Sequence, residues 1–147
     1  MKRKKDVSFL LVLLLAFGLL SGCGRGEQVK QSGFGLYYLS ADKTDLVKVS
    51  AEKEGKTKEE QIKHVLDVLQ KPKEESEDYQ SPFIKDVSVK EFEVDGKQVD
   101  LSFNEKYRSL DTTEEVLLRA ADRKSTEQIY GIQDVYFYID GETQLRK

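Results

Sequence analysis

The chain contains a single cysteine, Cys23, so thiol chemistry is the first possibility to consider. A disulfide would require a second cysteine, and a catalytic thiol would require an activating base or a cationic pocket. The residues that follow, Gly24-Arg25-Gly26, are typical of a flexible tether and not of a pocket. The sequence therefore favours a role for Cys23 outside the folded part of the protein.

The segment before Cys23 has the parts of an export signal. A basic cluster at residues 2–5 precedes an apolar run from Val7 to Leu20, and two small residues, Ser21 and Gly22, follow. The apolar run is shorter than the roughly 20 residues that a membrane-spanning helix needs. The tetrapeptide that ends at Cys23 resembles a bacterial lipobox, which implies cleavage before the cysteine and acylation of it, for example by palmitate. An ordinary secretory signal is the alternative.

From this resemblance we expect residues 1–22 to be a lipoprotein signal peptide and residues 23–34 to be a flexible tether. The mature protein would then lie on the extracytoplasmic face of a bacterial cell membrane, held there by its lipid. Residues 23–147 carry 20 basic and 26 acidic side chains, a net charge of −6. This acidity argues against nucleic acid as a partner and against a second, electrostatic contact with anionic lipid.

Other candidates for chemistry lack the partners that their chemistry requires. The single histidine, His64, stands in a predicted helix without a cluster of metal ligands around it in the sequence. The acidic run at residues 74–78 lacks the glycine-punctuated spacing of a calcium-binding loop and is more typical of a solvated loop. Asp100 could be a general base, but its place between Val99 and Leu101 favours a solvent-facing side chain. We therefore predict no catalytic residue, no bound metal and no cofactor.

The tyrosines are the remaining candidates. In the last predicted strand, residues 135–140, Tyr136 and Tyr138 share one face and the apolar residues share the other. If the apolar face meets the helices, the two tyrosines lie on the open side of the sheet, and Tyr37 or Tyr38 of the first strand would join them. Clustered exposed tyrosines are typical of protein interfaces. Cross-strand packing that stiffens the sheet is the alternative.

Seven elements would have to position these side chains. Strands are predicted at 35–40, 46–50, 87–94, 99–103 and 135–140, and helices are predicted after two capping boxes, Thr57/Glu60 and Thr112/Glu115. We expect a β-bulge near Lys90-Glu91 and a type I′ hairpin turn at Asp95-Gly96.

Pro72 should end the first helix, and Gly131 is a candidate C-terminal cap of the second. The second helix would bury the face that contains Val116, Leu117, Ala120 and Ala121. The predicted fold is α+β, with one mixed or antiparallel sheet, both helices on one face, and the order ββαββαβ.

Four stretches of the sequence together resemble the GerMN domain family of sporulation and germination proteins. They are residues 36–39 with 46–49, 65–72 (VLDVLQKP), 99–103 (VDLSF) and 129–141 (IYGIQDVYFYIDG). The resemblance covers residues 35–142 and leaves 143–147 as a C-terminal tail. The sequence departs from the family at Arg123, Lys124 and Thr126, where more apolar residues are usual, and we expect one such domain in this chain.

The resemblance implies a fold similar to ring-building motifs and a non-enzymatic role in sporulation or spore germination. We expect a lipid-anchored module that binds an envelope protein or copies of itself. A small surface ligand-binding lipoprotein or enzyme is the alternative function, and a regulator of another envelope protein with no link to sporulation is a third.

Overall fold

The computed structural model describes residues 33–72 and 76–145. The predictions for the signal peptide, for Cys23 and for most of the tether fall outside the described residues, as does part of the acidic run. The elements, in chain order, are β1 (Gly35–Ser40), β2 (Leu46–Ser50), α2 (Lys58–Gln70), β3 (Tyr79–Gln80), β4 (Val89–Asp95), β5 (Gln98–Phe103), the 3-10 helix η2 (Glu105–Ser109), α3 (Thr112–Thr126), β6 (Asp134–Ile139) and β7 (Thr143–Gln144).

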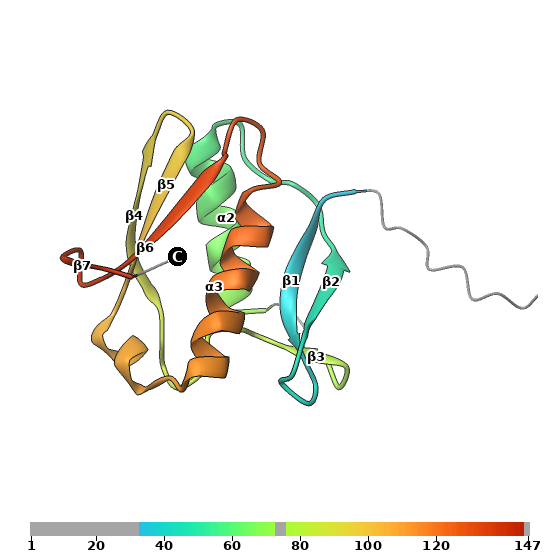
Figure 1. The fold of residues 1–147 in the computed structure, drawn as a ribbon. Coiled ribbons are helices and arrows are strands. Elements are labelled where there is room, and N and C mark those ends of the chain that lie inside the picture. The colour runs from blue at the N-terminus through green and yellow to red at the C-terminus, as the bar shows by residue number, and fades with distance from the viewer. Residues whose placement is uncertain (1–32, 73–75, 146–147) are drawn as a thin grey trace, which may run out of the picture. The chain divides into compact units, whose positions relative to one another are not determined.

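The strands form two sheets, and the prediction of one sheet is therefore wrong, although the α+β class is confirmed. The first sheet has the order β2-β1-β3 and the second has the order β4-β5-β6-β7. Within residues 33–145, α2 and α3 lie between the two sheets, so that each helix contacts β1 on one side and a strand of the four-stranded sheet on the other (Figure 1). The short β7 occupies residues that were expected to form a tail.

Ser125 of α3 and Gln128, just after the C-cap of α3, bind backbone groups in the part of β1 that does not pair with β3. The Gly35 amide donates to Oε1 of Gln128 over 3.2 Å, and Nε2 of Gln128 donates back to the Gly35 carbonyl over 2.6 Å. The Tyr37 amide donates to Oγ of Ser125 over 3.0 Å. These bonds satisfy backbone groups that a neighbouring strand would otherwise satisfy. The part of β1 that β3 leaves unpaired is thus covered by the end of α3 and the residues that follow it.

The four-stranded sheet is mixed. β4 and β5 are antiparallel, whereas β5 and β6 are parallel and joined through α3. The predicted bulge is confirmed by a register shift between Val89 and Glu91. The hairpin is confirmed as well, but Asp95 ends β4 opposite Gln98, and positive φ (59°) occurs at Gly96 alone of the turn's central residues. Positive φ at the first central residue is the pattern of a type II′ turn and not of the expected type I′ turn.

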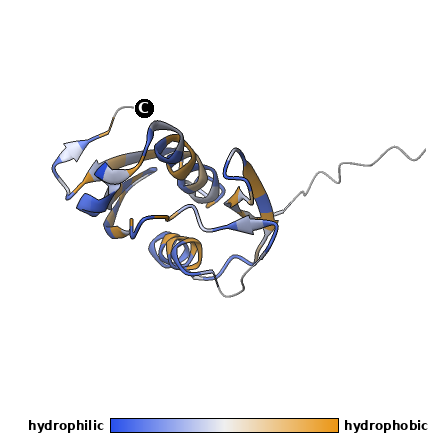
Figure 2. Cartoon of the chain, turned by 90° about the horizontal axis from the view of Figure 1, so that it is seen from below, coloured by the Kyte–Doolittle hydropathy of each residue, from blue (hydrophilic) through white to orange (hydrophobic). Residues whose placement is uncertain are grey.

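The core lies between the helices and the inner faces of the sheets. Phe103 of β5 is fully buried, with its ring centroid 5.9 Å from that of Phe137 and 4.8 Å from that of Tyr107. Ile62, Val65, Leu66 and Leu69 of α2 are buried against them. Figure 2 shows hydrophobic and hydrophilic stretches side by side along the helices and strands, as expected for elements that bury one face.

The helix starts agree with the sequence for α2 and differ by one residue for α3. Thr57 and Glu60 form the predicted capping box. In α3 the box is Asp111 with Glu114 instead of Thr112 with Glu115, and Asp111 accepts from the amides of both Thr113 and Glu114. An aspartate is a stronger N-cap than a threonine.

The predicted apolar face of α3 is partly wrong, since Ala121 is buried and Leu117 and Ala120 are half-buried, but Val116 is not. Val116 is 52% exposed, and the buried residues are Leu118, Ala121, Asp122, Ser125 and Thr126. Small side chains let α3 approach β1 closely, so the helix is buried through positions that hydropathy alone does not select. Gly131 has positive φ (85°), but it lies in the turn after Ile129, because α3 ends at Thr126 with Glu127 as its C-cap.

Candidate interaction surface on the four-stranded sheet

The candidate site is the outer face of the four-stranded sheet, the side that points away from the helices. Alternation along β5 sends Val99, Leu101 and Phe103 into the core, so Asp100 points the other way. On β6 the same alternation buries Val135, Phe137 and Ile139 and leaves Tyr136 and Tyr138 half-buried on the outer side. The predicted division of β6 into an apolar and a tyrosine face is confirmed.

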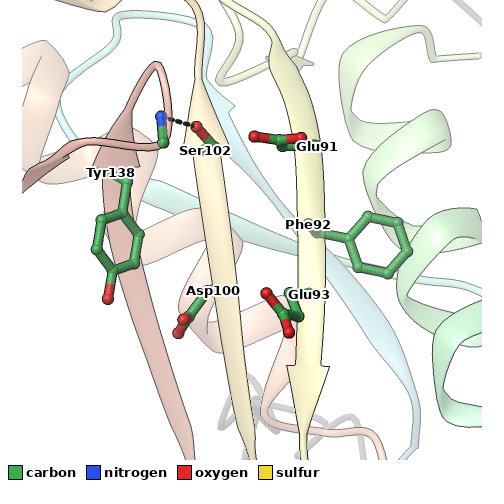
Figure 3. Close-up of a pocket in the computed structure, with 7 residues that line it drawn as sticks. Glu91, Phe92, Glu93, Asp100, Ser102 and Tyr138 are labelled. Atoms are coloured by element: carbon green, nitrogen blue, oxygen red, sulfur yellow. Dashed lines mark hydrogen bonds between the residues drawn. The ribbon is translucent and has the colours of Figure 1, made fainter.

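Strand register brings carboxylates beside these tyrosines. Asp100 pairs with Tyr136 of β6 and with Glu93 of β4, and Ser102 pairs with Tyr138 and with Glu91. We call the set Glu91, Glu93, Asp100, Ser102, Tyr136 and Tyr138 the acidic tyrosine face. Figure 3 shows Tyr138, Asp100 and Glu93 in a row across three strands, while the ring of Phe92 projects to the other side, toward α2.

A hollow of about 490 Å³ lies on this face. Its lining includes Glu91, Glu93, Asp100 and Tyr138, with Gly141 at one end. The Gly141 amide donates to Oγ of Ser102 over 2.6 Å, so the serine hydroxyl is engaged by the backbone and largely covered. The lining contains three carboxylates and no basic side chain.

Electrostatics on the face are dominated by negative charge. Oδ1 of Asp100 accepts from Nε2 of Gln98 over 2.7 Å, which fixes the carboxylate in place. Partial burial raises the pKa of Tyr138, and the nearby Asp100 carboxylate raises it further. Beyond the face, Nζ of Lys90 lies 3.0 Å from Oδ1 of Asp140, and this hydrogen bond lowers the pKa of Asp140. The arrangement therefore suits a cationic partner that also offers surface for tyrosine rings.

The other tyrosines singled out from the sequence do not join this face, because β1 belongs to the other sheet. Tyr38 is a core residue, 4% exposed, with its ring 4.9 Å from that of Tyr79. Tyr37 points to the opposite side of β1, where Nζ of Lys48 lies 6.0 Å and Nζ of Lys124 lies 5.4 Å from its ring centroid. The expectation of one tyrosine cluster is wrong, and its two halves lie in different sheets.

Glu91 and Glu93 were not singled out from the sequence. The hairpin at Asp95-Gly96 could have located them, since that turn fixes the register that sets Glu93 opposite Asp100.

His64 lies on α2, with Nδ1 3.5 Å from Oε2 of Glu54, at a hollow of about 300 Å³ between α2 and the β1–β2 hairpin. This hollow borders the first sheet, whereas the acidic tyrosine face belongs to the four-stranded sheet.

One buried titratable group lies outside the face. Asp122 of α3 is fully buried, and neither of its carboxylate oxygens has a hydrogen-bond partner among residues 33–72 and 76–145. Burial raises its pKa well above the ordinary value of 3.8. The Asp122 carboxyl is therefore held in its neutral form well above the pH at which an exposed aspartate ionises.

The described residues hold no group of three or more histidine, cysteine, aspartate or glutamate side chains placed to bind a metal ion. None of their helices combines the length and the apolar content that crossing a membrane demands.

Comparison with known proteins identifies related sequences and folds. The family model Germane, described as "Sporulation and spore germination", matches residues 35–145. The first GerMN domain of the sporulation protein GerM from Bacillus subtilis superimposes with a TM-score of 0.60 and 14% identity, over 78% of this chain and 86% of that domain.

The tandem GerMN domains of the same Bacillus subtilis protein give a TM-score of 0.56 and 14% identity, over 78% of this chain and 40% of theirs. The chain thus corresponds to one of two repeated domains there. A search of curated proteins returned no match.

Proposed function

This chain belongs to the Germane family of sporulation and spore germination, with a GerMN-type fold, and from that premise we propose that it is a non-enzymatic assembly module anchored to the membrane by lipid. Its working surface would be the acidic tyrosine face. The observation that carries the proposal is the contrast between the two sides of β6, where Val135, Phe137 and Ile139 are buried and the tyrosines of the outer side are half-exposed.

The chemistry of the face supports binding more than catalysis. Its carboxylates lie beside one another across strands, where like charges repel and a cationic partner would relieve the repulsion. Tyrosine rings supply large contact area with little loss of side-chain freedom. Oγ of Ser102 accepts a hydrogen bond from the Gly141 amide and has no histidine beside it in the described part of the chain. The serine therefore lacks the base that would activate it as a nucleophile.

Membrane anchoring is the second part of the proposal. The lipobox-like end at Cys23 would leave a lipid on the first residue of the mature chain, and a short tether would connect it to Gly33, where the described domain begins. Confinement to a membrane raises the effective concentration of binding partners, so that a weak surface contact suffices for assembly. Cys23→Ala should release the protein from the membrane fraction, whereas continued partitioning into detergent would argue against the anchor.

Ligand binding is the second candidate function, because the hollow between α2 and the β1–β2 hairpin carries apolar residues and a His64–Glu54 pair. It would place the functional site on α2 and not on the outer sheet face. Val68→Trp would fill that hollow, since Val68 lines it and is not fully buried. A growth or germination defect from Val68→Trp, with none from changes on the sheet face, would favour this candidate.

The proposal is tested by photo-crosslinking in intact sporulating cells. A photoreactive phenylalanine analogue at Tyr138 should capture a protein, and the same analogue at Tyr130 should not. Tyr130 is the matched control because it is 91% exposed and lies on the loop between α3 and β6, away from the face. Equal capture from both positions, or capture from neither, would contradict the assignment of the surface. Capture only in vegetative cells would contradict the link to sporulation.

A further inference from the structure

The first sheet carries a second tyrosine surface of opposite charge. Tyr37 points away from the core because its neighbours Leu36 and Tyr38 point into it. Lys48 is its direct partner across the β1–β2 pair, and Lys124 reaches its ring from α3, with Nζ 5.4 Å from the ring centroid. We call Tyr37, Lys48 and Lys124 the basic tyrosine face.

The basic and acidic tyrosine faces lie on opposite sides of the helix layer. β1 and β2 lie on one side of α2 and α3, and β4, β5 and β6 lie on the other (Figure 1). Tyr37 and Lys48 belong to the outer side of the first sheet, and Lys124 reaches Tyr37 from the C-terminal turn of α3. The acidic face belongs to the outer side of the second sheet. A partner on one face therefore leaves the other face accessible.

Charge decides which pairs of faces can meet. Two acidic tyrosine faces in contact would set Glu91, Glu93 and Asp100 of one copy against the same carboxylates of another. Two further acidic residues, Asp95 and Asp134, lie at the hairpin end of the same sheet, where both pair with Gln98. Such like-charge contacts cost free energy and suppress wrong pairings. A two-fold symmetric contact through this face is therefore disfavoured, whereas an acidic face against a basic face is complementary.

We propose that two copies of this chain associate head to tail, with the basic tyrosine face of one copy on the acidic tyrosine face of the next. The inference rests on the proposed function and names the partner of its surface as a second copy. Tyr37 would meet Tyr136 and Tyr138, while Lys48 and Lys124 would pair with Glu91, Glu93 and Asp100. In a dimer built this way, one copy keeps an unused acidic face and the other keeps an unused basic face. Further copies can therefore add at both ends, which gives a ring or an open filament.

The test uses the acylated full chain in lipid vesicles or detergent micelles, with assembly size measured by sedimentation velocity over a concentration series. One variant, Glu91→Lys/Glu93→Lys, blocks the acidic face at two exposed positions on edge strand β4. The other, Lys48→Gln/Lys124→Gln, weakens the basic face. We expect each variant alone to associate about tenfold more weakly than the wild type, and added salt to weaken wild-type assembly.

Mixing the two variants distinguishes a head-to-tail contact from a two-fold one. The first variant keeps its basic face and the second keeps its acidic face, so one productive contact remains between them. At concentrations where the wild type forms multimers and each variant alone should not, an equimolar mixture should give dimers and no larger species. A mixture that stays monomeric at those concentrations would overturn the proposal, and so would full-sized multimers in either variant alone.

A control variant, Lys71→Gln/Lys106→Gln, removes two exposed lysines that lie on neither face and should assemble like the wild type. Thermal unfolding of all variants checks that each is folded. The crosslink at Tyr138 separates the two levels of the argument. A product of twice the chain's mass supports the self-association. A product with a different protein alone overturns it but leaves the proposed function standing, and the absence of any product contradicts both.

Discussion

The two sheets differ in what their outer surfaces carry, although both display a tyrosine. Around Tyr136 and Tyr138 the neighbouring strands supply carboxylates, whereas around Tyr37 a neighbouring strand and a helix supply lysines. Tyr38, one residue along from Tyr37, belongs to neither surface and is buried against Tyr79. A tyrosine by itself therefore does not define a binding surface, because the charge across the strand pair decides what it can bind.

The largest difference between the two sheets should be in stability. Phe103 lies beneath the acidic tyrosine face and contacts Phe83, Tyr107 and Phe137. Phe103→Ala should lower the free energy of unfolding by about 3–5 kcal/mol, because it removes a fully buried ring and leaves a cavity. Tyr37→Ala, on the outer side of the other sheet, should lower it by less than about 1 kcal/mol. Urea denaturation measures both, and similar losses would mean that Tyr37 is also a core residue.

The second prediction compares two polar residues of α3. Ser125 faces β1 and is hydrogen-bonded, whereas the Asp122 carboxyl is buried without a partner. The folded-state pKa of Asp122 is raised above its unfolded value of 3.8, so its contribution to stability is fully present below that pH. As the pH rises from about 4 toward the folded-state pKa, stability is lost at about 1.4 kcal/mol per pH unit.

Asp122→Asn removes this titration, so the variant should be more stable than the wild type at pH 7 and should gain less, or nothing, at pH 4. Thermal melts at both pH values give the difference between the two proteins. That subtraction removes the opposite contributions of Asp42, Glu114 and Asp140, whose pKa values are lowered and which favour folding at higher pH. An unchanged difference between pH 4 and pH 7 would show that Asp122 is ionised in the folded protein.

The third prediction concerns the hydrogen bonds between Gln128 and the start of β1. Gln128→Ala removes two hydrogen bonds to Gly35 and should lower the free energy of unfolding by about 1–2 kcal/mol. Amide exchange should speed up at Gly35 and Tyr37 of β1 while remaining slow at Leu101 of β5, because the damage is confined to the first sheet. Uniform acceleration in both sheets would show that the two unfold as one unit.

The smallest expected effect is electrostatic and is confined to the acidic tyrosine face. Asp100→Asn removes a negative charge beside Tyr138 and should lower the pKa of that tyrosine toward its ordinary value of 10.0. Global stability should change by no more than about 0.5 kcal/mol. Titration of the tyrosine ring resonances by NMR measures the shift. A pKa that does not move would mean that burial and the neighbouring Tyr136, and not Asp100, perturb Tyr138.

Local patterns in the sequence determined much of this protein. Alternation predicted the strands and the split of β6 into apolar and tyrosine sides, the capping box at Thr57 and Glu60 placed the start of α2, and Asp95-Gly96 located a hairpin. The likeness of four short stretches to the GerMN family was confirmed over residues 35–145. These features succeed because each depends on residues within one turn or one strand pair.

The number of sheets and the composition of each tyrosine face were decided only by the tertiary structure. Gln128 and Ser125 bind the part of β1 that β3 leaves unpaired from 93 and 88 residues away, so no local pattern could show that the end of α3 and the residues that follow it cover that part. The surroundings of Lys124 and Thr126 were also decided only by packing, since Lys124 borders Tyr37 and Thr126 is buried at the end of α3. Side chains far apart in the sequence acquire a shared environment when elements pack, and that environment sets charge, burial and partner choice.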